Sequence, residues 1–345
     1  MLNQDAEAIR KKAEEAEITP VYIALFGQPG AGKSSLINAI VGQPLAAIGV
    51  ENDVTTERTD YEWNGLFLSD LPGYGTAKFP AATYLKKFEI AKFDIFLCVT
   101  AGKLKADDIL FFRELAHAGK RCVFVRNKID AEFEPGVTDA EMRARIATSV
   151  HEQIGRDDKV IFTSCRTTQG LDELITTITN TLSGVKRDRF LRSAAAYSKE
   201  FLDAKRAACG NYAWYAAGVS ALANMVPVPG LGITADITAM LAAMAKIRSD
   251  FNLTSARMDR FANLMPSVAP FINTFISYAT SEGATLLLKR VSLGVATAEA
   301  AKYIPGLGTL VAGAVSLATI RLVLKMYIDD CYKIADEMLT AHFQG

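Results

Sequence analysis

The chain of 345 residues is too long for one ordinary domain, and its 50% apolar residues are too many for a disordered chain, so we expect two or three folded domains. The 38 basic and 38 acidic residues give a formal net charge of zero, which excludes a generally basic nucleic-acid-binding protein. We therefore expect no nucleic acid among its partners.

The first segment, residues 1–19, is expected to form a charged helix. Eight charged side chains surround few apolar positions over residues 1–18, a pattern that is typical of a solvated helix and not of a signal peptide. We expect this helix to pack with the helical domain further along the chain.

Residues 20–183 alternate short strand-like runs with helix-like stretches. The strand-like runs lie at 21–26, 67–70, 94–100, 121–127 and 159–164, and the helix-like stretches lie at 33–41, 81–92, 105–118, 139–154 and 171–182. This alternation predicts an α/β domain with a mainly parallel sheet and helices on both of its faces.

Residues 184–345 lack strand signals and are rich in Ala, Leu, Met and Gly, so we expect an all-α helical domain with apolar hairpins. Its helices should break at 227–232, near Pro266 and Pro270, and at 305–308, because proline ends helices and glycine supplies the positive φ of tight turns. The tetrapeptide Pro-Gly-Leu-Gly occurs in the first and the last of these breaks.

Three uncharged stretches of this half, 213–235, 261–281 and 303–320, reach the length of a membrane span. Each has Pro or Gly near its middle, which leaves three interpretations open. The hairpins are buried in a soluble α-domain, or their tips at Leu231 and Leu307 insert into lipid on cue, or the stretches span a membrane constitutively. Basic residues that flank the stretches can meet either anionic lipid head groups or solvent: Lys199, Lys205, Arg206, Arg321 and Lys325.

Residues 27–34 match the pattern of a phosphate-binding loop, between a predicted strand and a predicted helix. Glycines let consecutive backbone N–H groups wrap the phosphates, and the helix N-terminus adds its positive dipole end. Lys33 supplies a cation to the β- and γ-phosphates, and Ser34 supplies a hydroxyl ligand to Mg²⁺. The nucleotide-binding residues expected here are Gly27, Gly30, Ala31, Gly32, Lys33, Ser34 and Ser35.

A second motif, from Asp70 to Gly73, begins 37 residues after Lys33, at the end of a predicted strand. The Asp70 carboxylate can hold Mg²⁺ through water, and the N–H of Gly73 can sense the γ-phosphate. We therefore expect the loop that follows Asp70 to act as a nucleotide-dependent switch.

A third motif, Asn-Lys-Ile-Asp at 127–130, follows another predicted strand. The Asp130 carboxylate can accept hydrogen bonds from N1–H and the 2-amino group of guanine, a donor pair that adenine lacks, while Lys128 can lie along the base. After the last strand, a backbone N–H at Ser164 or Cys165 can meet guanine O6. The expected ligands are GTP, GDP and Mg²⁺, and the expected base-binding residues are Asn127, Lys128, Asp130, Ser164 and Cys165.

Residues 20–183 resemble the GTP-binding domain of immunity-related GTPases, which belong to the dynamin-like group. Beyond the nucleotide motifs, the resemblance is carried by the stretches Val54–Arg58, Asp70–Gly75, Phe79–Leu85 and Phe124–Asp130. Residues 184–345 resemble the helical domain of this family in character and in the stretch Val226–Gly230. The neutral composition and compact length suggest a prokaryotic or divergent member, and the intact Lys33 resembles the hydrolysis-competent type.

The resemblance implies an enzyme that hydrolyses GTP and is activated when two copies dimerise across the nucleotide face. It implies that Thr55, with Thr56 as an alternative, binds Mg²⁺ and the γ-phosphate in the triphosphate state. It also implies that Glu51 positions the attacking water. The alternative for Glu51 is a solvated loop carboxylate.

Tyr74 stands where Ras-like enzymes carry the glutamine that orients the attacking water. An aromatic side chain cannot replace the donor and acceptor of a carboxamide. We therefore expect slow intrinsic hydrolysis until another residue or a partner completes the site, which agrees with the dimerisation that the resemblance implies.

Two classes of function remain open. In the first, a GTPase assembles on membranes, and its nucleotide state controls dimerisation, oligomerisation and membrane association. In the second, a soluble GTPase switch or assembly factor acts on a protein or RNA partner without lipid contact. The intact Lys33, Ser34, Thr55 and Asp70 disfavour a third class, a scaffold that binds nucleotide without hydrolysing it.

The five cysteines are widely scattered, and none of their spacings is that of zinc ligands. We therefore expect reduced thiols in a cytoplasmic protein, which associates peripherally with membranes if the first class of function holds.

Overall fold

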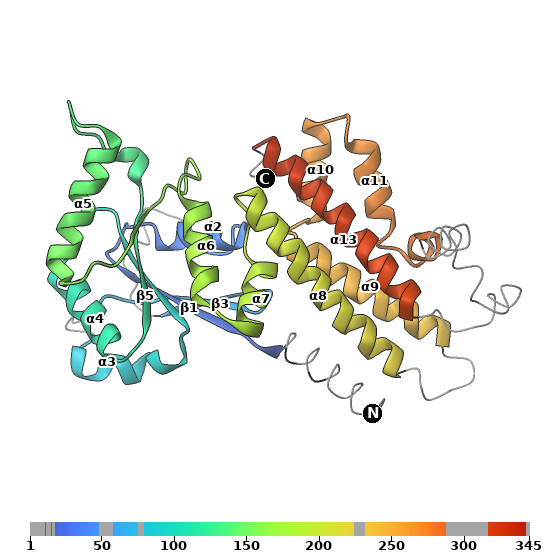
Figure 1. Cartoon of the computed structure of the whole chain (residues 1–345), viewed down its shortest axis with the longest axis horizontal. Coiled ribbons are helices and arrows are strands. Elements are labelled where there is room, and N and C mark those ends of the chain that lie inside the picture. Colours follow the sequence, from blue (N-terminus) through green and yellow to red (C-terminus); the bar gives the residue numbers. More distant parts are fainter. Residues whose placement is uncertain are drawn as a thin grey trace, which may run out of the picture. The chain divides into compact units, whose positions relative to one another are not determined.

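The computed structural model describes residues 11, 15, 18–47, 58–74, 79–223, 232–287 and 317–342. The chain divides into two compact units (Figure 1). Thr19–Phe201 form the first, here called the sheet unit, and Met1–Ile18 with Leu202–Gly345 form the second, the helical unit. Most of the helix expected at 1–19 lies outside the described residues.

A six-stranded sheet forms the centre of the sheet unit, with the strand order β2-β3-β1-β4-β5-β6. Its parallel strands are β1 (Val21–Gly27), β3 (Leu66–Asp70), β4 (Ile95–Thr100), β5 (Arg121–Arg126) and β6 (Val160–Phe162). All six residues of β4 are buried, as its continuous apolar run predicts for a central parallel strand. Because the strands are parallel, their carboxyl ends and the loops that follow meet at one edge of the sheet.

Helices cover both faces of this sheet, as predicted (Figure 1). One face carries α2 (Lys33–Val41), α6 (Leu171–Thr181) and α7 (Gly184–Ser193), and the other carries α3 (Ala81–Lys87), α4 (Ala106–His117) and α5 (Asp139–Ile154). Short 3₁₀ turns lie at Ile90–Lys92 and Ile129–Ala131. The observed mainly parallel sheet between two helical layers confirms the predicted fold class of this half.

The edge strand β2 (Thr59–Trp63) was not expected, and it pairs antiparallel with β3. The two strands form a hairpin at Asn64 and Gly65, whose φ angles of 46° and 81° are both positive. Asn-Gly between two strand-like runs is a strong hairpin signal, because these residues tolerate the left-handed conformation that a two-residue turn requires. The Asn-Gly dipeptide at 64–65 could therefore have predicted this strand from the sequence.

Helix α7 belongs to the sheet unit, although it follows the last strand-like run. Phe190 is fully buried, and the indole nitrogen of Trp63 on β2 donates to the carbonyl oxygen of Ser193 at 3.2 Å. The sheet unit thus extends to Phe201, beyond the boundary expected after residue 183. Composition places the boundary too early here because α7 is a helix whose apolar residues complete the core of the sheet.

All the secondary-structure elements among the described residues of the helical unit are helices. They are α8 (Lys199–Ala223), α9 (Gly232–Asp250), α10 (Ser255–Leu264), α11 (Ala269–Ser277) and α13 (Leu317–Thr340). The break between α10 and α11 contains Pro266, and Pro270 lies in the first turn of α11, which confirms the break expected there. Leu231, Leu307 and both Pro-Gly-Leu-Gly turns lie largely or wholly outside the described residues.

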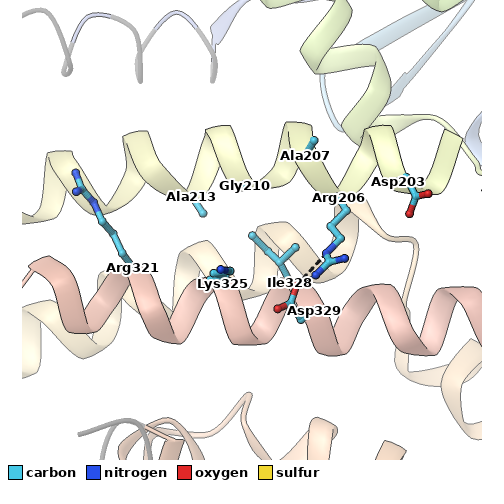
Figure 2. Close-up of a pocket in the computed structure, with 9 residues that line it drawn as sticks. All are labelled: Asp203, Arg206, Ala207, Gly210, Ala213, Arg321, Lys325, Ile328 and Asp329. Carbon is cyan, nitrogen blue, oxygen red and sulfur yellow. Dashed lines mark hydrogen bonds and ion pairs between the residues drawn. The ribbon is translucent and has the colours of Figure 1, made fainter. Parts of the chain in front are cut away.

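A groove of about 580 Å³ lies between α8 and α13 (Figure 2). It is lined by Asp203, Arg206, Ala207, Gly210 and Ala213 of α8 and by Arg321, Lys325, Ile328 and Asp329 of α13. The tertiary structure thus brings Arg206 of α8 to the same groove as Arg321 and Lys325, which lie one turn apart on α13. Arg206 forms an ion pair of 2.5 Å with Asp329 across the groove.

Lys205 was expected to meet either lipid head groups or solvent, and both expectations are wrong, because the residue is buried. Only 2% of the residue is exposed, and its ammonium donates a hydrogen bond of 2.7 Å to the carbonyl oxygen of Asp250. Its position on α8 turns its side chain into the helical unit. None of the described helices combines the length and the apolar character that crossing a membrane requires.

Candidate nucleotide-binding site

The loop between β1 and α2 has a backbone that only glycine can follow at two of its positions. Gly27 and Gly32 have φ angles of 129° and 89°, and a Cβ at either position would collide with a neighbour. The colliding groups are the carbonyl of Val99 at Gly27 and the side-chain amide of Asn127 at Gly32. These close approaches fix the loop against β4 and β5, in the geometry that lets backbone N–H groups face a phosphate.

Lys33 begins α2 and its ammonium is held over this loop. Its Nζ donates to the carbonyl oxygens of Gly27 at 3.2 Å and of Gln28 at 3.3 Å, and it lies 3.6 Å from Oδ1 of Asp70. Only 6% of the Lys33 side chain is exposed. A buried cation that is fixed by two carbonyl oxygens is well placed to meet a polyphosphate at the loop.

Asp70 ends β3, next to β1, and its carboxylate is buried beside Lys33. Burial raises the pKa of this carboxyl group, and the charge of Lys33 opposes the rise. Its Oδ1 has no hydrogen-bond partner among the described residues. A buried oxygen with spare acceptor capacity fits a hard divalent cation such as Mg²⁺, which prefers oxygen ligands. Ser34, the second predicted ligand, follows Lys33 at the start of α2.

The loop after Asp70 is anchored to the aromatic core. The hydroxyl of Tyr84 on α3 donates a hydrogen bond of 2.5 Å to the carbonyl oxygen of Pro72. Tyr74 stacks on Phe111 of α4, with ring centroids 4.8 Å apart, and meets Tyr84 edge to face at 5.1 Å. Two helices on one face of the sheet therefore hold the segment that was predicted to be a switch.

Tyr74 itself points into this core. Only 6% of the residue is exposed, and burial together with a hydrogen bond to Glu114 raises the pKa of its hydroxyl above its ordinary value. A neutral phenol that is bonded within the core cannot orient water at a phosphate. This placement supports the inference that the chain lacks the water-orienting group of Ras-like enzymes at this position.

Asn127 follows β5, and its side chain makes hydrogen bonds to the phosphate-binding loop and to the segment at the end of β6. Its Nδ2 donates to the carbonyl oxygen of Ala31 at 3.0 Å, while its Oδ1 accepts from the hydroxyl of Thr163 at 3.1 Å and from the thiol of Cys165 at 3.8 Å. The residue is 2% exposed. These bonds occupy the amide within the protein, so Asn127 holds the backbone of the phosphate-binding loop and the end of β6 in place relative to each other.

Asp130 lies in the 3₁₀ turn Ile129–Ala131, and its side chain is more exposed than the buried Asn127. The chain turns there because Lys128 adopts a left-handed conformation with a φ of 61°, and the N–H of Ile129 donates to the carbonyl oxygen of Thr163 at 3.1 Å. A hydrogen bond from Ser164, helped by Arg166, holds the pKa of the Asp130 carboxyl below its ordinary value. Asp130 is therefore an ionised acceptor at neutral pH.

The segment after β6 supplies the remaining predicted contact. The N–H of Ser164 already donates to the carbonyl oxygen of Gln169 at 2.9 Å, so Cys165 is the better of the two candidates for guanine O6. Burial raises the pKa of the Cys165 thiol to about 12, so it is neutral and inert as a nucleophile. Lys128 passes beside the phosphate-binding loop, with its Cε 3.9 Å from the place of a Cβ at Gly32.

The structure thus gathers most of the predicted residues at the carboxyl edge of the sheet. Lys33 and Ser34 begin α2 and Asp70 lies beside Lys33, whereas Asp130 and Cys165 lie near each other after β5 and β6. Ser35 lies in the first turn of α2 and Gly73 in the anchored loop. Glu51, Thr55 and Thr56 lie outside the described residues, so their roles remain predictions.

Two further residues brace the site and were not expected. The amide of Gln28 donates to the carbonyl oxygen of Lys103 at 2.5 Å, which ties the phosphate-binding loop to the turn after β4. Arg126, only 8% exposed, donates to the carbonyl oxygen of Gly102 and pairs with Glu132. The sequence could have indicated a role for Arg126, because it is a charged residue at the end of a mostly apolar strand. For Gln28, the only indication was its place in the phosphate-binding loop.

A model of the family described as Interferon-inducible GTPase (IIGP) matches residues 1–279 of the chain. Interferon-inducible GTPase 5 of Rattus norvegicus is 27% identical over 349 residues, which cover 93% of this chain and 75% of that protein. Interferon-inducible GTPase 1 of Mus musculus is 25% identical over 276 residues, covering 74% and 67%. A solved structure of a probable GTP-binding protein, engB, is 19% identical, with a TM-score of 0.35, and covers 47% of this chain and 98% of that one.

Replacing Tyr84 by Phe should loosen the loop after Asp70 without disturbing the ring packing. We expect an unfolding free energy lower by about 1 kcal/mol, since one buried hydrogen bond to Pro72 is lost. GTP turnover should fall severalfold while the affinity for GDP stays within about twofold, because this loop is predicted to sense the γ-phosphate, which GDP lacks. Urea unfolding, steady-state turnover and nucleotide titration measure these three effects.

The matched control is Tyr197→Phe, since the hydroxyl of Tyr197 donates to the main-chain carbonyl of Ala39 at 2.7 Å in the same unit. It should lose similar stability and keep normal turnover. Equal turnover in both variants would show that the bond to Pro72 has no part in the switch.

Proposed function

The chain belongs to the interferon-inducible GTPase family and is a GTPase, and we propose that its nucleotide state controls its own dimerisation or oligomerisation. The observation that carries the nucleotide binding in this proposal is the arrangement of Lys33 and Asp130 on the two segments that Asn127 joins. The burial of Tyr74 supports the dimer. A buried cation on a phosphate-binding loop and an ionised acceptor beside it match the two parts of a guanine nucleotide.

At the phosphate end, the loop N–H groups and the ammonium of Lys33 would bind the β- and γ-phosphates. Ser34 and Asp70 would hold Mg²⁺, directly and through water, and Thr55 would complete its ligands in the triphosphate state. The cation, when bound, neutralises charge that develops on the phosphates as the terminal bond breaks. Lys33 orients the phosphates from the buried side, because two carbonyl oxygens fix its position.

At the base end, Asp130 would accept hydrogen bonds from N1–H and the 2-amino group of guanine. The N–H of Cys165 would donate to O6, and the side chain of Lys128 would lie along the base. Adenine presents an acceptor where guanine presents N1–H, so the same carboxylate would repel it.

Completion of the site by a second copy is the part of the proposal that explains hydrolysis. Tyr74 is buried against Phe111 and is unavailable to orient water. Glu51 is the candidate that the family resemblance offers for this role. A dimer across the nucleotide face would complete the water-positioning site of each copy, so hydrolysis would be coupled to assembly.

A second candidate function is a soluble GTPase switch that acts on a protein or RNA partner without lipid contact. Peripheral membrane association is favoured by the uncharged stretches 213–235 and 303–320 and by the three basic residues along the groove of the helical unit. The two candidates share the nucleotide chemistry and differ only in what the helical unit binds.

Asp130→Asn should weaken GTP binding by roughly 10- to 100-fold, because the charged acceptor of two hydrogen bonds is lost. The affinity for xanthosine triphosphate should rise, since the new amide can donate to the keto group that replaces the 2-amino group. Competition titrations against a fluorescent GDP derivative measure both. Asp139→Asn, at a carboxylate on α5 with 79% of its side chain exposed, is the control and should change neither affinity.

Turnover per molecule should rise with protein concentration, because a second copy would complete the water-orienting group that Tyr74 cannot provide. The measurement is steady-state GTP hydrolysis over about a hundredfold range of concentration, with light scattering to detect a GTP-dependent dimer. Glu51→Ala should abolish the rise if Glu51 positions the water. Constant turnover per molecule with no dimer would refute the proposed coupling.

Leu231→Asp combined with Leu307→Asp should abolish pelleting with liposomes, because each leucine at a lipid-inserting turn would contribute roughly 1.5–3 kcal/mol of burial. GTP binding should remain normal. The matched control changes Leu264 and Leu286, which are 66% and 63% exposed elsewhere in the helical unit, to Asp. If the Leu231 and Leu307 variant pellets like the wild type, the soluble switch is the better description.

A further inference from the structure

Asp130 is held by groups that approach it from two directions. Ser164, which is fully buried, supplies a hydrogen bond from the protein side. Arg166 approaches from the solvent side, with its Nε 2.8 Å from Oδ2 of Asp130 and with 77% of its own side chain exposed. Only 16% of the Asp130 side chain is exposed, so the guanidinium covers much of the face that the protein leaves open.

The backbone beneath Arg166 is fixed, whereas its side chain extends into solvent. The N–H of Thr167 donates to the hydroxyl of Ser164 at 3.1 Å, and the N–H of Ser164 donates to the carbonyl oxygen of Gln169 at 2.9 Å. These bonds hold the turn that follows β6. Arg166 can therefore leave Asp130 by side-chain rotation alone, on the fast timescale of exposed rotamers, without any rearrangement of the turn.

A guanidinium and the recognition edge of guanine are chemically alike. Both are planar and both present adjacent N–H donors to a carboxylate. A base that uses both oxygens of Asp130 needs the Oδ2 atom that Arg166 holds. The two ligands are therefore alternatives at the same acceptor.

We propose that Arg166 competes with the guanine base for the carboxylate of Asp130, so that the base binds only after the arginine has turned away. The inference rests on the proposed function, because it places guanine at Asp130. It assigns to Arg166 a role in setting how fast and how tightly the nucleotide binds, a role distinct from contact with the bound nucleotide.

The size of the effect follows from the exposure of the pair. Mostly exposed ion pairs shift an equilibrium by a factor of roughly two to five at low salt. The apparent affinity is reduced by the fraction of molecules in which Asp130 is open. Because Arg166 departs before the base enters, the reduction falls on the association rate constant and leaves the dissociation rate constant unchanged.

The test compares Arg166→Gln with the wild type in stopped-flow measurements with a fluorescent GDP derivative, on the full chain. We expect the association rate constant to rise about two- to fivefold at low salt, and the rise to vanish near 1 M salt, where surface ion pairs are screened. Arg166→Lys, which keeps the charge without the planar fork of donors, should give an intermediate rate.

The matched control is Arg145→Gln, which removes an exposed arginine that pairs with Glu134 at 3.1 Å in the same unit. It should change neither rate constant. A faster dissociation in Arg166→Gln would show that Arg166 holds the bound nucleotide, and unchanged rates would show that it does not compete. Either result overturns the inference.

The wild type separates this inference from the proposed function. If it binds an ADP derivative as tightly as the GDP derivative, guanine recognition fails and the competition fails with it. If it selects GDP and Arg166→Gln leaves association unchanged, the competition alone is refuted and the proposed function stands.

Discussion

Both ends of the proposed nucleotide site depend on the hydrogen bonds of one side-chain amide, that of Asn127. It binds the carbonyl oxygen of Ala31 in the phosphate-binding loop and accepts from Thr163 at the end of β6. Its nitrogen also fills the space that a Cβ at Gly32 would need. A buried amide with its bonds satisfied is costly to disrupt, so this one residue fixes the distance between the phosphate end and the base end.

The two ends of the site differ in their electrostatic environment. Lys33 and Asp70 are buried together, where charges interact strongly and water is excluded, which suits the binding and cleavage of a polyphosphate. Asp130 lies at the rim, within reach of the exposed Arg166, where interactions are weaker and exchange is easier. The contacts of Tyr74 and Tyr84 connect the loop after Asp70 to α3 and α4, so a displacement of this loop would be felt by both helices.

The sequence by itself determined the fold class of the sheet unit and which strand ends carry the candidate site. Buried parallel strands need continuous apolar runs, and a loop that approaches phosphate needs glycine, so both are visible as local patterns. The motifs around Lys33, Asp70 and Asp130 therefore located the ends of three strands correctly. The Asn-Gly turn at 64–65 carried an equally local signal for the unexpected strand β2.

Only the tertiary structure decided what each residue in these motifs contacts. The side chains of Tyr74 and Lys205 are buried. Helix α7 packs within the sheet unit. Arg166 forms an ion pair with Asp130, 36 positions earlier in the sequence. These outcomes depend on which surfaces meet when the helices pack, and on bonds between segments far apart in the chain. No local pattern encodes such pairings, because the same side chain is stable in solvent or in the core according to the partner that folding brings to it.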